Sequence, residues 1–114
     1  MKLIIKARNF KPTLSFKKMV ESKFKHIDYF VNKAAVLEIG LLDDFGPQRG
    51  NDKVVEINLA DIYKNKKVIR IEERADSWDK AIDFAKERLE RVLEDRKEKE
   101  KAPYKRKKRK FSRL

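Results

Sequence analysis

Hydrophobic residues in this chain recur with two different spacings, and the order of those spacings constrains the fold more than any other feature. A spacing of two, or a short apolar run, is typical of β-strands and marks four segments. Spacings of three and four place apolar residues on one face of a helix and mark two more. The strand segments are Met1–Asn9, Ala34–Leu42, Lys53–Leu59 and Val68–Glu73, and the helical segments run from about Leu14 to Val31 and from Trp78 to Leu93.

The residues that flank the helical segments indicate where each helix begins and ends. Thr13 or Ser15 can cap the first helix, and Asp76 and Ser77 compete to cap the second. Pro103 should end any helix that continues into the charged residues beyond the second apolar stripe, because proline removes a backbone donor.

The predicted order of elements is β-α-β-β-β-α. This order indicates an α+β fold, a two-layer α/β sandwich in which a four-stranded sheet carries both helices on one face. The first two strands should be parallel, because a helix joins them by a right-handed crossover. The last three strands should form an antiparallel meander.

Positive charge is concentrated at the end of the chain. The 114 residues include 31 Lys or Arg and 19 Asp or Glu, which gives a net charge of +12. Lys97–Leu114 holds ten basic residues against two Glu, a net +8, whereas residues 1–96 hold 21 against 17, a net +4. We therefore expect one domain over residues 1–97 and a basic, disordered tail over 98–114. Such a chain should bind a polyanion, with nucleic acid the first candidate and an anionic membrane surface the second.

Catalytic and metal-binding chemistry is not expected. The chain has no Cys and a single His, His26, so the sequence predicts no thiolate site and no multi-His metal site. The adjacent carboxylates Asp43–Asp44 and Glu72–Glu73 should point to opposite faces of their strands. No apolar run approaches the roughly 20 residues of a membrane span. We expect a soluble cytoplasmic protein with no catalytic residues, cofactor or small-molecule substrate.

The basic residues of the two helices are the best candidates for a binding surface. If both helices pack on one face of the sheet, their outer sides form a platform on which Lys23, Arg88 and Arg91 can face a phosphate backbone. An alternative is a solvated surface held by ion pairs at a spacing of four, Glu21 with Lys25 and Glu87 with Arg91. The sequence leaves both interpretations open.

The aromatic residues do not predict a base-stacking sheet. Core packing is expected for the aromatics in the apolar stripes, and core-edge packing is favoured for those outside them, so RNA contacts should involve backbone and shape. The first group is Phe16, Phe24, Phe30 and Trp78, and the second is Tyr29, Phe45 and Tyr63.

Several segments, taken in order, are similar to one protein family. They are KPTLSFKKMVESKFKHIDYFV, VVEINL, VIRIEERA and SWDKAIDFAKERLERVL, whose ending reads Arg88-Leu89-Glu90-Arg91-Val92-Leu93. Over about residues 1–97 the chain resembles the ribosome hibernation promoting factor family, also called ribosome-associated inhibitors, ribosomal subunit interface proteins or sigma-54 modulation proteins. At 114 residues it resembles the short form of that family, although its tail is unusually basic.

The resemblance implies a function. Members bind the small ribosomal subunit in the channel for mRNA and the A- and P-site tRNAs. They inhibit translation and preserve idle ribosomes under stress or in stationary phase. The implied partners are 16S-type rRNA, the small subunit and the whole ribosome, and Lys23, Arg88 and Arg91 match basic positions of the family. To these the charge pattern adds Lys86, Arg96, Lys97, Lys105, Arg106, Lys107, Lys108, Arg109 and Lys110.

A generic double-stranded-RNA-binding protein or an integral ribosomal protein is the alternative. Two helices on an antiparallel sheet are also the shape of double-stranded-RNA-binding domains, although those domains begin with a helix rather than a strand.

Overall fold

A computed structural model describes residues 1–44, 52–61 and 68–113, and side chains as far as Arg96. Residues 45–51 and 62–67, which connect the last three strands and include Phe45 and Tyr63, lie outside the described residues, so the packing expected for these two aromatics is not tested. The elements are β1 (Lys2–Arg8), α1 (Leu14–Phe24), the 3₁₀-helix η1 (Lys25–Phe30), β2 (Val36–Asp43), β3 (Lys53–Ala60), β4 (Ile69–Ala75) and α2 (Trp78–Arg113).

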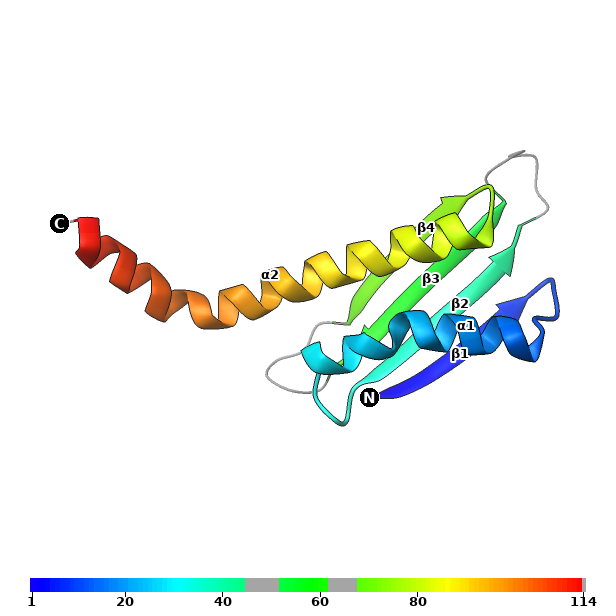
Figure 1. The fold of residues 1–114 in the computed structure, drawn as a ribbon, viewed down its shortest axis with the longest axis horizontal. Coiled ribbons are helices and arrows are strands. Elements are labelled where there is room, and N and C mark those ends of the chain that lie inside the picture. Colours follow the sequence, from blue (N-terminus) through cyan, green and yellow to red (C-terminus); the bar gives the residue numbers. More distant parts are fainter. Residues whose placement is uncertain (45–51, 62–67, 114) are drawn as a thin grey trace.

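The four strands form one mixed sheet in the order β1-β2-β3-β4. β1 and β2 are parallel, and β2, β3 and β4 form an antiparallel meander. Both helices lie on the same face of this sheet (Figure 1). The predicted fold class, element order and strand directions are thus confirmed.

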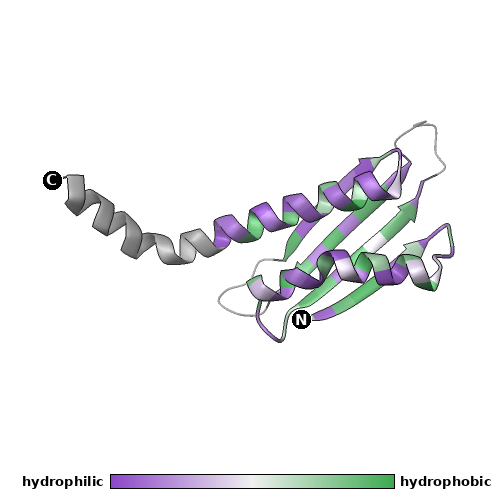
Figure 2. Cartoon of the chain, in the orientation of Figure 1, coloured by the Kyte–Doolittle hydropathy of each residue, from purple (hydrophilic) through white to green (hydrophobic). Residues whose placement is uncertain are grey.

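The core lies between the sheet and the two helices. In register across the sheet, Ile5 pairs with Ile39, Ile39 with Ile57 and Ile57 with Ile71, so the period of two places one apolar row beneath the helices. Phe24 of α1 and Leu89 of α2 belong to the same core cluster and are fully buried. Figure 2 shows hydrophobic colour interrupted by hydrophilic bands along the strands and mixed colour along the helices, as expected for two amphipathic layers.

The first helical segment differs from the single helix expected up to Val31. Thr13 caps it as predicted, since its Oγ1 accepts the Phe16 N–H at 3.1 Å. The α-helix then ends at Phe24, and η1 continues the chain with three residues per turn. With three residues per turn, η1 directs both Ile27 and Phe30 toward the core, in line with Phe24 at the end of α1.

Of the two residues expected to compete as cap of the second helix, Ser77 provides the capping hydrogen bond. Ser77 Oγ accepts the Lys80 N–H at 3.3 Å, while Asp76 pairs with the Lys80 ammonium at 3.2 Å. The expectation that Pro103 would end the helix was wrong, because α2 runs through it to Arg113. A proline inside a helix removes one hydrogen bond and bends the axis, and the ribbon of α2 changes direction along its length (Figure 1). The division into a domain over 1–97 and a tail over 98–114 stays a prediction.

An aromatic cluster joins the turn after β1 to the start of α2. The Phe10 ring stacks on Trp78 with centroids 4.8 Å apart, and Phe16 meets Trp78 edge-on at 5.9 Å. The Lys53 ammonium lies 5.7 Å from the Trp78 ring and donates to Asp43 at 2.9 Å. That hydrogen bond raises the pKa of Lys53. The predicted packing roles of Phe16 and Trp78 are confirmed.

We expect Leu89→Ala to lower the free energy of unfolding by about 2–5 kcal/mol, because it leaves a cavity at a fully buried position of α2. Val92→Ala, on the same helix but 37% exposed, is the control and should cost less than about 1 kcal/mol. Urea unfolding followed by Trp78 fluorescence measures both. Equal costs would contradict the assigned packing of α2.

Candidate nucleic-acid interface

Polar and charged side chains pair across the boundary between α1–η1 and α2, which share one face of the sheet. Lys23 of α1 points to α2, where its Nζ lies 2.6 Å from Asp83 Oδ1. His26 of η1 pairs with Glu90 of α2 at 2.7 Å, and Lys86 approaches the same carboxylate at 3.8 Å. The predicted RNA-binding residues Lys23 and Lys86 therefore already hold carboxylates between the helices.

Arg88 lies on the other flank of α2. Its guanidinium is 3.0 Å from Glu73 Oε1 of β4. Positions 83 and 88 are five residues apart, which is about 140° around an α-helix. Lys23 and Arg88 are thus directed to opposite sides of α2, and the three residues matched to the family do not form one cluster.

Arg91 and Arg96 are more accessible to a ligand. Arg91 is exposed and Arg96 half-buried, and neither forms an ion pair with a side chain that the structure describes. The side chains of the other predicted contacts lie outside the described residues; these are Lys97, Lys105, Arg106, Lys107, Lys108, Arg109 and Lys110.

Among the described helical residues, the excess of positive over negative charge lies on α1 and η1. Lys17, Lys18 and Lys25 are exposed and, within residues 1–44, 52–61 and 68–96, have no ion-pair partner. The alternative pairs Glu21–Lys25 and Glu87–Arg91 do not form there. Residues 14–30 hold four Lys against two acidic residues, whereas residues 78–96 of α2 hold five basic against six acidic residues. Counting charge separately for each helix would have indicated α1 as the stronger basic surface.

The opposite face of the sheet is largely neutralised. Lys6 pairs with Glu38 at 3.3 Å and Arg8 with Glu56 at 3.4 Å. Arg74 pairs with Asp44 at 3.0 Å. Because several cations of this face are held by neighbouring strands, the helical face is the better surface for a polyanion.

Neither a metal centre nor a membrane span is found in the described part of the chain. No three acidic or histidine side chains there converge in a geometry that could hold a metal ion. Its helices include none that is both long and apolar enough to cross a bilayer.

The chain belongs to the family described as sigma 54 modulation protein / S30EA ribosomal protein, which matches residues 3–101. Among solved structures, the N-terminal domain of Protein Y from Thermus thermophilus is 24% identical with a TM-score of 0.62, covering 82% of this chain and 96% of that domain. A ribosomal subunit interface protein from Coxiella burnetii is 15% identical with a TM-score of 0.65, covering 85% and 98%. These two structures share the fold. No curated protein sequence matches the chain.

Proposed function

We propose that this protein is a ribosome hibernation factor. It binds the small ribosomal subunit in the mRNA and tRNA channel of the decoding region, inhibits translation and preserves inactive ribosomes under stress or in stationary phase. Membership of a family described as S30EA ribosomal protein supports this proposal, as do the names of the two solved structures. The observation that carries it for this chain is the group of exposed lysines on α1 and η1, Lys17, Lys18 and Lys25, which have no ion-pair partner among the described side chains.

Contact with rRNA phosphates is the binding mode that these charges support. Lys17, Lys18 and Lys25 are exposed point charges that can meet phosphates without breaking an ion pair to any side chain that the structure describes. Arg91 extends the same mode to α2, where a guanidinium can bind a phosphate through two hydrogen bonds. Such contacts read backbone shape rather than base sequence.

The ion-paired residues can join the interface by exchanging partners. Lys23, Lys86 and Arg88 each face a carboxylate at a partly exposed position. An exposed ion pair contributes only about 0–1 kcal/mol, so a phosphate can replace the carboxylate at small cost. We include these residues in the proposed interface, together with Arg96, Lys97 and the basic run from Lys105 to Lys110.

The proposed mechanism is occupancy. A folded domain in the channel excludes mRNA and tRNA, so inhibition requires no bond to be made or broken. Inhibition should then rise with occupancy of the small subunit and be reversed when the protein is removed by salt, which weakens phosphate contacts.

Sedimentation of ribosomes from cells that make this protein tests the proposal. We expect the protein on intact ribosomes in stationary phase, and we expect its release by high salt and on renewed growth. Added to a cell-free translation system, it should suppress synthesis as it saturates the small subunit. Retention through growth and high-salt washing would instead identify an integral ribosomal protein, and binding to any RNA duplex without inhibition would identify a generic RNA-binding protein.

A further inference from the structure

Tyr29 is unusually exposed for an aromatic residue of a packed domain. It lies in η1 and exposes 85% of its surface. Its neighbours Ile27 and Phe30 face the core, so the short 3₁₀-helix turns Tyr29 outward. Packing at the core edge, which the sequence favours for this side chain, is therefore wrong.

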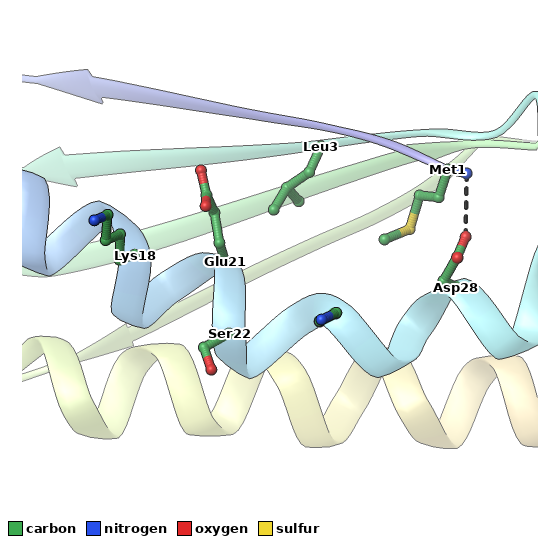
Figure 3. Close-up of a pocket in the computed structure, with 7 residues that line it drawn as sticks. Met1, Leu3, Lys18, Glu21, Ser22 and Asp28 are labelled. Carbon is green, nitrogen blue, oxygen red and sulfur yellow. Dashed lines mark ion pairs between the residues drawn. The ribbon is translucent and has the colours of Figure 1, made fainter.

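The Tyr29 side chain borders a surface hollow of about 420 Å³. Ser22, Lys25, His26 and Asp28 complete its lining. A second hollow, of about 510 Å³, shares three of these residues and continues toward β1. Figure 3 shows Leu3 of β1 and the preceding Met1 on one side of this second hollow, with Glu21 of α1 and Asp28 of η1 on the other.

Lys25 lines the first hollow and is the positively charged residue there that can bind a ligand. Asp28 pairs with the amino group of Met1 at 3.1 Å, and His26 pairs with Glu90 at 2.7 Å. Lys25 has no ion-pair partner among the described side chains. An exposed aromatic ring beside an unpaired lysine combines the two groups that bind single-stranded nucleic acid, a stacking surface and a phosphate contact.

We infer that Tyr29 stacks on an unpaired base of single-stranded RNA while Lys25 holds the adjoining phosphate. This inference rests on the proposed function and adds to it a direct contact with a base. The surroundings favour RNA over a protein partner, because the other four residues that line the hollow at Tyr29 are polar or charged. Lys17 and Lys18, on the same helical layer, extend the positive surface along which a strand would run.

The test uses the full chain and a short, fluorescently labelled, single-stranded oligo(A) RNA, with an RNA duplex of the same length as a second probe. Fluorescence anisotropy at fixed salt should show that Tyr29→Ala weakens binding of the single strand by about 5- to 100-fold, the range expected for loss of one stacked base. Tyr29→Phe keeps the ring and should bind within about twofold of wild type. Duplex binding should be unchanged, since its bases are already stacked.

Phe84→Ala is the matched control. Phe84 is also an exposed aromatic, at 48%, but it lies on α2 away from the two hollows, so its removal should leave oligonucleotide binding unchanged. The inference is overturned if wild type does not bind the single strand, or if Tyr29→Ala binds it as tightly as wild type. Equal binding of the single strand by Tyr29→Ala and wild type is also the result expected if Tyr29 instead contacts a protein partner.

Cell-free translation with the same variants separates this inference from the proposed function. If wild type inhibits translation but oligonucleotide binding does not depend on Tyr29, the inference fails and the proposed function stands. If binding depends on Tyr29 but wild type neither sediments with ribosomes nor inhibits translation, the proposed function fails alone.

Discussion

Reversing the three unpaired lysines of the α1–η1 surface, as Lys17→Glu, Lys18→Glu and Lys25→Glu together, is expected to weaken binding to the small ribosomal subunit by about 100-fold or more. Each hydrogen bond to a charged group contributes about 1.5 kcal/mol or more, so three lost contacts exceed this factor before repulsion from the new carboxylates is added. The three side chains are exposed and unpaired in the described structure, so the fold should be unaffected. Filter binding of purified subunits measures the affinity.

The matched control for this variant is Lys2→Glu, Lys33→Glu and Arg70→Glu. It changes the net charge by the same amount at three exposed positions away from the outer side of α1. Binding by this control should change much less than binding by the α1 variant. If both variants lose affinity equally, only overall charge matters and the assigned surface is wrong.

Deleting Pro103–Leu114 is expected to make ribosome binding much less dependent on salt. The segment contains seven Lys or Arg. Each neutralised phosphate of single-stranded nucleic acid contributes about 0.7 to the slope of log K against log salt, so the slope should fall by up to about 5. Affinity should fall most at low salt. Binding titrations over a salt series measure this slope.

A second variant keeps the length of the deleted segment constant. Replacing its basic residues with Ser and Gly should reduce the slope as much as the deletion does, because charge and not chain length carries the effect. A slope equal to that of wild type in both variants would contradict the proposal that this segment follows RNA.

The sequence predicted the sheet well because its signal is local. A period of two assigns every strand residue to a face, and a register error would place Ile39 or Ile57 on the wrong side. The preference of Thr, Ser and Asp for N-cap positions likewise narrowed each helix start to two residues, and in each pair one residue accepts the capping hydrogen bond. The apolar spacing missed the 3₁₀-helix because intervals of three between Phe24, Ile27 and Phe30 also occur in α-helices. Tyr29 lies outside the apolar stripe whether the segment is an α-helix or a 3₁₀-helix, so its exposure could have been predicted from its position; the general tendency of aromatic rings to pack favoured the core edge instead.

The charged site was less predictable because its pairs join residues far apart in the chain. Lys23 and Asp83 are 60 positions apart, and His26 and Glu90 are 64 apart. Rules for neighbours on one helix suggested Glu21 with Lys25, whereas the structure leaves Lys25 unpaired among the described residues. Which lysines are free therefore follows from the packing of α1 and η1 against α2, which only the fold defines.

A cryo-electron microscopy map of the protein bound to its own ribosome would show whether the helical face meets rRNA in the decoding region. We expect density in the mRNA and tRNA channel of the small subunit, with Lys17, Lys18 and Lys25 against rRNA phosphates and the open face of the sheet turned away from them. Density outside the space between the subunits, or the open sheet face against the RNA with α1 in solvent, would contradict it.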